Sequence, residues 1–250
     1  ADHLIADEAE FRRILSLAIW VAYESGKLIT IGINPSRPET GYGYIQVVDE
    51  DGATNPYLSR GIFRVKTFAE KPNRETAQRF LESGDFLWNS GMFIWKVDTI
   101  LREIAASLPE LSGELGKIEA SIGTDHIAQA IETGYRIIRG ISIDYGVMEK
   151  AHEVYVLRGE FGWSDVGSWD EVYRISGKDA DGNSVSGKAV LHGTKNTLVH
   201  SGDWIVAAVD VEDLIIIASY NAILVCKRGE SQDVKEVVDY LRRKQMTDYL

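Results

Sequence analysis

Apolar residues recur along the chain with two different spacings, one typical of helices and one typical of strands. Over residues 8–25 they repeat at helical spacing, and the flanking residues Asp7 and Gly26 are favourable helix caps. The apolar stretch KLITIGI, residues 27–33, predicts a buried strand. The alternation in IFRVKTFAEKP, residues 62–72, predicts a strand with one buried face. The first part of the chain therefore combines helices with strands.

The same combination continues over most of the chain. Residues 74–83 predict a helix, and FLWNSGMFIWKV, residues 86–97, predicts a tight Asn-Ser-Gly turn joined to an aromatic strand. Two further helices are predicted at residues 98–107 and 124–134. Because strands alternate with helices, we expect residues 1–181 to form an α/β domain with helices covering its sheet.

The pattern changes at about Gly182, where short apolar segments separated by turn residues begin. These segments predict strands at residues 188–192, 196–200, 204–209, 214–219 and 222–227. Residues 231–244 then return to the spacing of an amphipathic helix. We therefore expect residues 182–250 to form a small β-rich domain, arranged as a meander or a β-roll, with a helix at its C-terminal end.

Composition and charge narrow the range of partners. The 250 residues are 44% hydrophobic and 26% charged, with a net charge of -11. Because this charge repels polyanions, we expect neither nucleic acid nor a membrane surface as a partner. No apolar stretch reaches the roughly 20 residues that span a bilayer. The single cysteine, Cys226, lies in the apolar run NAILVCK, so we interpret it as a buried strand residue of a cytoplasmic protein.

Candidate functional residues occur where predicted strands end. Glu70 and Lys71 follow the strand that begins at residue 62, and ligands of α/β sheets usually bind at such ends. A carboxylate accepts hydrogen bonds from sugar hydroxyls, and an ammonium group pairs with phosphate. The alternative interpretation of the two residues is a solvated charged turn.

Three other residues have both a binding interpretation and a structural one. Gly43, in TGYGYI, suits a close approach of the backbone to a ligand, but two glycines also form an ordinary turn. Asn89, in WNSGMF, offers a donor and an acceptor, or belongs to a type I turn. Asp144, in SIDYGVMEKA, is a candidate ligand-binding acid or the N-cap of a helix.

One further acid, Asp165 in FGWSDVGSW, lies between two tryptophans. The two large rings predict a partly dry pocket around its carboxylate, which then needs a partner other than bulk water. The alternative is that Ser164 or Asp165 caps the following helix. Asp2 and His3 form another polar pair at a predicted strand end, or a solvated pair near the terminus.

Taken together, the motifs ADH, RPETGYGYI, EKP, FLWNSGMF, SIDYGVMEKA and WSDVGSW resemble, in this order, those of the mannose-1-phosphate guanylyltransferase (GDP-mannose pyrophosphorylase) family. The resemblance covers essentially the whole chain. It implies a Rossmann-like fold with a mixed central sheet and a small β-rich C-terminal domain. It also implies a Mg²⁺-dependent reaction in which GTP and mannose 1-phosphate give GDP-mannose and pyrophosphate.

The resemblance also implies roles for individual residues. Asp2 and Asp165 match the acids that hold the catalytic Mg²⁺, and Lys71 matches the catalytic cation near the sugar phosphate. Around the sugar, the matching residues are Gly43, Glu70, Asn89 and Asp144. Mg²⁺ prefers hard oxygen ligands, typically one or two carboxylates together with phosphates and water, which agrees with this assignment.

The sequence departs from the family at its start. Family members begin with a glycine-rich G-x-G-x-R loop that grips the nucleotide, and no such loop occurs in these 250 residues. We therefore expect a fragment that turns over GTP poorly. The optional C-terminal cupin domain of the family, which isomerises mannose 6-phosphate, does not occur in these residues either, so we expect no isomerase activity. The alternatives are a non-catalytic sugar-phosphate-binding or regulatory subunit, and a sister enzyme that acts on glucose 1-phosphate. The β-rich region is also a candidate homodimer interface.

Overall fold

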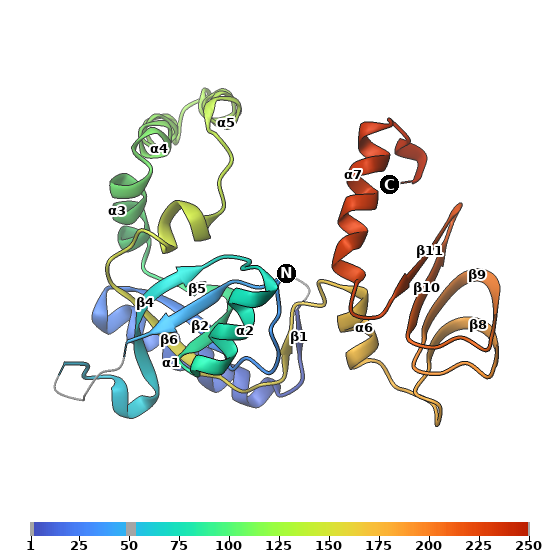
Figure 1. The fold of residues 1–250 in the computed structure, drawn as a ribbon. Coiled ribbons are helices and arrows are strands. Elements are labelled where there is room, and N and C mark those ends of the chain that lie inside the picture. Colours follow the sequence, from blue (N-terminus) through green and yellow to red (C-terminus); the bar gives the residue numbers. More distant parts are fainter. Residues whose placement is uncertain (1–2, 49–53, 250) are drawn as a thin grey trace. The chain divides into compact units, whose positions relative to one another are not determined.

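The computed structural model describes residues 3–48 and 54–249. Contacts divide the chain into two compact units (Figure 1). The larger unit is Ile5–Trp163, and the smaller unit combines Ser164–Leu250 with the residues up to Leu4. Each unit is described separately below.

The larger unit is built on a closed barrel of five strands. These strands are β2 (Leu28–Ile33), β3 (Tyr44–Val47), β4 (Ile62–Ala69), β5 (Phe86–Ile94) and β6 (Val154–Gly159). They pair in the order β2-β5-β3-β4-β6. β2 and β6 run parallel, whereas the other neighbours run antiparallel. The sheet is therefore mixed, as the family resemblance implied.

Helix α1 (Glu8–Ser25) begins and ends at the predicted capping residues. The Asp7 side chain accepts a hydrogen bond from the Glu10 N–H at 2.9 Å, and Gly26 adopts the left-handed conformation with φ 64°. The Gly26 N–H donates to the Ala22 carbonyl oxygen at 3.1 Å. One face of α1 packs into the core beside β2, all six residues of which are buried. Its buried residues are Ile14, Ala18, Val21 and Ala22.

Further helices surround the barrel, with α3–α5 on one side and α1 on another (Figure 1). They are α2 (Arg74–Ser83), α3 (Val97–Ser107), α4 (Pro109–Ser121) and α5 (Ile127–Ile137). The sequence pattern missed α4, because Gly113 and Gly116 lower its intrinsic helix propensity. Among the described residues, no helix combines the length and apolar character required to cross a membrane.

The predicted Asn-Ser-Gly turn is wrong, because β5 continues through these residues. The pairing of β5 with β2 shifts its register between Thr30 and Gly32, opposite the segment from Asn89 to Phe93. Gly91 adopts a φ of 72°, and the Ser90 hydroxyl donates to the Ile31 carbonyl oxygen at 2.6 Å. The turn-forming residues therefore form a bulge within a strand.

The smaller unit contains a four-stranded sheet with helices at its start and end. Its elements are α6 (Trp169–Ile175), β8 (Ser184–His192), β9 (Leu198–Val209), β10 (Leu214–Ser219), β11 (Ala222–Lys227) and α7 (Val234–Arg243). The sheet order is β11-β10-β9-β8, in which β8, β9 and β10 run parallel and only β10 and β11 antiparallel. The predicted meander is therefore wrong, because its neighbours would all run antiparallel. Two of the predicted strands merge into β9, whereas the C-terminal helix is confirmed.

The boundary between the two compact units differs from the domain boundary that the sequence predicts between residues 181 and 182. The contact-based division follows Trp163, so α6 belongs to the same unit as the sheet. The reason is packing: Trp169, Val172 and Tyr173 of α6 form one apolar cluster with residues of β9 and β10. The predicted domain limits stay a prediction.

Replacing the N-cap of α1 tests the local basis of this fold. Asp7→Ala removes the acceptor of the Glu10 N–H, and loss of such a cap costs about 1 kcal/mol. We expect hydrogen exchange in the first turn of α1 to become about fivefold faster by local opening. Asp7→Asn keeps the acceptor and should exchange nearly like the unchanged protein. Equal exchange rates in the two variants would contradict the capping role.

Candidate functional site

Five residues that the sequence singled out come together at one end of the barrel of the larger unit. We call them the Glu70 cluster: Gly43, Glu70, Lys71, Asn89 and Asp144. Gly43 precedes β3, and Glu70 follows β4. A Cβ atom at Gly43 would overlap Oε2 of Glu70 and would lie 3.3 Å from the Asn89 Cβ. The Asn89 N–H also donates to the Gly43 carbonyl oxygen at 2.8 Å. The backbone of Gly43 is therefore packed closely against the Glu70 carboxylate and Asn89.

The side chains of Asn89 and Asp144 orient each other. Asn89 Nδ2 donates to Asp144 Oδ1 at 2.9 Å, and Asn89 Oδ1 accepts from the Gly91 N–H at 3.2 Å. Asp144 begins the single π-helical turn η2 (Asp144–Met148), where no side-chain cap is formed. The turn interpretation of Asn89 and the cap interpretation of Asp144 are both wrong, because the two side chains bind each other across 55 positions of sequence.

Lys71 has an unusual backbone conformation for a residue with a side chain. Its φ is 47°, in the left-handed region, and its Nζ lies 3.0 Å from Oε1 of Glu70. The hydrogen bond to Glu70 raises the pKa of Lys71, and the charges of Glu70, Tyr145 and Asp144 act in the same direction. The Lys71 side chain is 62% exposed, but that of Glu70 is only 14% exposed. The alternative interpretation of a solvated charged turn therefore holds for Lys71 and not for Glu70.

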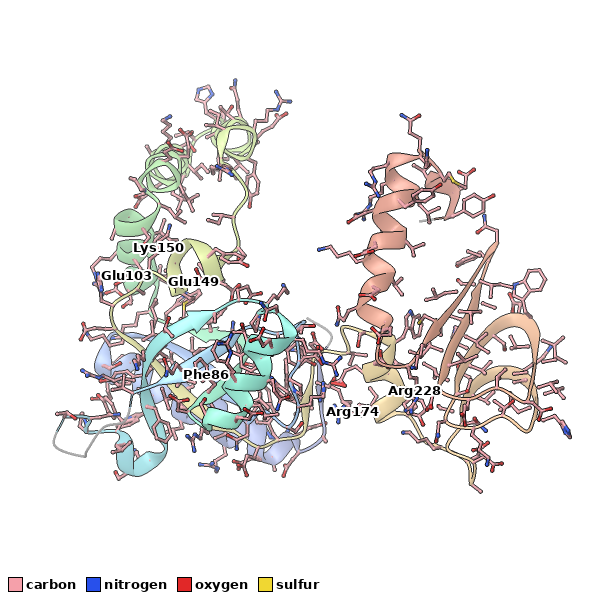
Figure 2. All side chains as sticks on the ribbon, viewed as in Figure 1. Phe86, Glu103, Glu149, Lys150, Arg174 and Arg228 are labelled. Atoms are coloured by element: carbon pink, nitrogen blue, oxygen red, sulfur yellow. The ribbon has the colours of Figure 1, made fainter. Side chains whose placement is uncertain are left out.

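Glu149 joins this group of charges, and the sequence analysis missed it. The residue is exposed, yet desolvation of its carboxyl raises its pKa, and the negative charges of Glu70 and Asp144 raise it further. Its N–H donates to the Asp144 carbonyl oxygen at 2.9 Å, across the π-helical turn. Figure 2 labels Glu149 and Lys150 on this segment. A separation of five residues does not place two side chains on one face of an α-helix, so the sequence pattern gave no signal.

The loop before Gly43 is held by aromatic rings and an ion pair. The Arg37 guanidinium lies 5.0 Å from the centre of the Trp88 ring, and its Nε lies 3.2 Å from Oε2 of Glu39. Tyr42 packs against Trp88 and Trp163 with ring centres 5.2 and 5.1 Å apart. These contacts fix the approach of the chain to Gly43, and Arg37 is a second residue that the sequence analysis missed.

Asp165 lies in the smaller unit, in a short loop between β7 (Trp163–Ser164) and α6. Its Oδ1 accepts from the Gly167 N–H at 2.9 Å, and Val166 between them has a φ of 53°. The helix cap is Ser168, whose hydroxyl accepts from the Glu171 N–H at 3.2 Å. The prediction that Ser164 or Asp165 caps the helix is therefore wrong, and the Asp165 carboxylate is oriented by its own loop.

Asp2, the other predicted metal ligand, lies outside the described residues. Its neighbours form β1 (Leu4–Ile5), which pairs with β7, the strand directly before Asp165. Within residues 3–48 and 54–249, no three His, Cys, Asp or Glu residues gather in a metal-binding arrangement. Asp165 itself fits Mg²⁺ chemically, because its carboxylate is a hard oxygen donor fixed by a backbone N–H. The shared metal site stays a prediction.

The larger unit is therefore a mixed α/β unit with polar groups at its strand ends, and the smaller unit contains a mostly parallel sheet. The family model described as "Nucleotidyl transferase" matches residues 1–182, and the chain belongs to this family. A second family model, described as "MannoseP isomerase/GMP-like beta-helix domain", matches residues 187–241.

Within the family, the chain is similar to an Escherichia coli protein named mannose-1-phosphate guanylyltransferase. The two are 40% identical over 253 aligned residues, which cover 100% of this chain and 52% of the relative. The chain therefore spans about half the length of the curated relatives that it matches.

Two solved structures are also similar. A protein of Thermus thermophilus described as a mannose-1-phosphate geranyltransferase aligns with a TM-score of 0.82 and 32% identity, over 96% of this chain and 68% of its own. A protein of Helicobacter pylori described as a mannose-6-phosphate isomerase aligns with a TM-score of 0.53 and 26% identity, over 66% and 61%. The first alignment includes both compact units of this chain.

The crowding of carboxylates in the Glu70 cluster can be measured by titration. Glu70→Gln removes one negative charge near Glu149, so the pKa of the Glu149 carboxyl should fall towards its ordinary value of 4.5. NMR titration of the side-chain carboxyl carbon measures this change. Because folding raises this pKa, ionisation of Glu149 destabilises the fold, and stability falls as pH rises from 4.5 through the raised value.

A matched control is Glu75→Gln, because the Glu75 side chain lies on α2 and is 84% exposed. This substitution should leave the Glu149 titration unchanged. If Glu70→Gln also left it unchanged, Glu70 and Glu149 would not interact as the structure indicates.

Proposed function

We propose that the protein is a mannose-1-phosphate guanylyltransferase, which forms GDP-mannose and pyrophosphate from GTP and mannose 1-phosphate. The observation that carries this proposal is the convergence of the Glu70 cluster, in which Glu70 and Asn89 pack against Gly43 and Lys71 pairs with Glu70. The 40% identity with the E. coli protein of that name supports the same substrates.

The Glu70 cluster offers the groups that a sugar ring needs. The carboxylates of Glu70 and Asp144 accept hydrogen bonds from hydroxyl groups, and Asn89 both donates and accepts. The missing side chain at Gly43 leaves the space that the Glu70 carboxylate occupies, so Gly43 sets where this carboxylate meets the ring. Lys71, whose side chain is 62% exposed, pairs with the phosphate on the sugar.

The proposed reaction requires no covalent bond to the protein. A phosphate oxygen of mannose 1-phosphate forms a bond to the α-phosphorus of GTP, and the bond from that phosphorus to the bridging oxygen of pyrophosphate breaks. Lys71 offsets the repulsion between the two anions and the negative charge that spreads in the transition state. The Glu70 cluster orients the sugar so that its phosphate attacks in line.

Asp165 and Asp2 are the residues that we propose to hold Mg²⁺. When bound, this ion supplies positive charge that stabilises the developing charge on the phosphates. The Gly167 N–H holds the Asp165 carboxylate in one orientation. A cytoplasmic location and a homodimer also remain proposals, the first supported by the single cysteine among 250 residues.

Gly43→Ala tests the proposed sugar site. The new Cβ atom displaces the Glu70 carboxylate, so kcat/KM for mannose 1-phosphate should fall on the order of 10- to 100-fold, with KM for GTP little changed. Gly113→Ala is a matched control, because a Cβ there meets no atom within 4 Å. Steady-state release of pyrophosphate measures both variants. Equal kinetics for the two would remove Gly43 from the sugar site.

Asp165→Asn in the complete protein tests the chemistry. We expect kcat to fall by a factor on the order of 10² or more, because metal coordination contributes several kcal/mol. Asp203→Asn, on the exposed part of β9, should leave kcat unchanged. Unchanged turnover by Asp165→Asn would contradict its proposed role.

The same assay, run with different substrates, separates the alternative functions. GTP, UTP and dTTP are each supplied with mannose 1-phosphate or glucose 1-phosphate, and calorimetry measures binding of each alone. We expect turnover with GTP and mannose 1-phosphate. Binding of mannose 1-phosphate without binding or turnover of any nucleotide would identify a non-catalytic subunit. Faster turnover of glucose 1-phosphate with UTP or dTTP would identify a sister enzyme.

A further inference from the structure

Asp170 and Ser231 are joined by reciprocal hydrogen bonds across 61 positions of sequence. Asp170 Oδ2 accepts from the Ser231 hydroxyl at 2.5 Å and from the Ser231 N–H at 3.2 Å. The Asp170 N–H in turn donates to the Ser231 hydroxyl oxygen at 3.3 Å. Asp170 Oδ1 accepts from the Gly229 N–H at 2.7 Å. We call this arrangement the Asp170–Ser231 pair; Ser231 is only 7% exposed.

The Asp170–Ser231 pair connects the start of α6, which follows the loop that carries Asp165, to the segment that follows β11. Asp170 lies in the first turn of α6, two residues after the cap residue Ser168. Ser231 lies in the turn between β11 and α7. The whole connection is contained in the smaller unit, which also holds the apolar cluster of α6 with β9 and β10.

The loop that carries Asp165 requires support from the structure around it. Val166 adopts a left-handed φ of 53°, which costs a β-branched residue on the order of 1–3 kcal/mol. A Cβ atom at Gly167 would lie 2.5 Å from Oδ2 of Asp165, so the carboxylate is packed directly against the loop backbone. Strained conformations of this kind persist only where the surrounding structure fixes both ends of the segment.

We propose that Asp170 and Ser231 are positioning residues, which fix the Asp165 loop so that the β-rich domain sets the orientation of the carboxylate. They act through the start of α6 and contact none of the reacting groups. This inference rests on the proposed function, in which Asp165 holds Mg²⁺. It assigns the domain after residue 182 a part in catalysis.

Cys226 provides a test that does not depend on activity. Burial raises the pKa of its thiol, and the negative charge of Asp170 raises it further. If Asp170 is held where the hydrogen bonds place it, Asp170→Asn should lower this pKa and make alkylation of Cys226 severalfold faster at pH 8. Mass spectrometry of the Cys226 peptide measures the rate. An unchanged rate would overturn the described position of Asp170.

The central experiment compares Mg²⁺ dependence in the complete protein. In Ser231→Ala and Asp170→Asn, the Mg²⁺ concentration for half-maximal activity should rise about 10- to 100-fold, the usual effect of losing groups that orient a metal ligand. KM for mannose 1-phosphate should change little. Ser231→Thr keeps the hydroxyl and should restore most of the affinity. Hydrogen exchange at the Gly167 amide, measured without metal, should become faster in the two weakened variants.

Matched controls separate positioning from general stability. Ser201→Ala removes a buried hydroxyl that accepts from the Lys188 N–H at 2.6 Å, and Asp179→Asn alters a carboxylate that accepts from the Asn183 N–H at 2.7 Å. Both should lower stability without changing Mg²⁺ dependence. Suppose that Ser231→Ala and Asp170→Asn change the Mg²⁺ dependence no more than these controls, while Asp165→Asn is inactive. The positioning role would then be contradicted, and the proposed function would still stand. Full activity of Asp165→Asn would instead contradict the proposed function.

Discussion

Repulsion between neighbouring carboxylates is the constraint on which the candidate site of the larger unit depends. The charges of Glu70 and Asp144 raise the pKa of Glu149, so the three groups share one electrostatic environment. Lys71 offsets the charge of Glu70 at 3.0 Å, and Asn89 donates to Asp144 at 2.9 Å. Each of these two acids thus has a cation or a donor beside it, which offsets part of the repulsion between the neighbouring carboxylates.

Local patterns in the sequence predict the elements that local interactions decide. The cap at Asp7, the buried strand β2 and the helix α2 all follow from residues within one or two turns of each other. The bulge in β5 was not predictable in this way, because pairing with β2 overrides the turn tendency of the Asn-Ser-Gly sequence. The parallel arrangement of β8 with β9 is likewise decided by packing between strands rather than by their individual patterns.

The candidate site also contains some residues that local sequence patterns predict and others that they do not. Strand ends and glycines singled out Gly43, Glu70 and Asn89, since chemistry at strand ends leaves a local signal. Glu149 and the Asp170–Ser231 pair leave none, because a π-helical turn and a contact across 61 positions form only in the folded chain. Motif order carried more information than any single residue, because six weak signals in sequence constrain one another.

The distribution of charge in the Glu70 cluster bears on what it binds. Three carboxylates and one lysine form a poor site for a bare phosphate, because the acids repel it and Lys71 is already paired with Glu70. They form a good site for a neutral ring with several hydroxyl groups, which donate to carboxylate oxygens. A sugar phosphate would then place its ring among the acids and its phosphate towards Lys71, whose positive charge offsets part of their repulsion. The approach of a second anion to this phosphate then requires further positive charge, which is the role that the proposed function assigns to Mg²⁺.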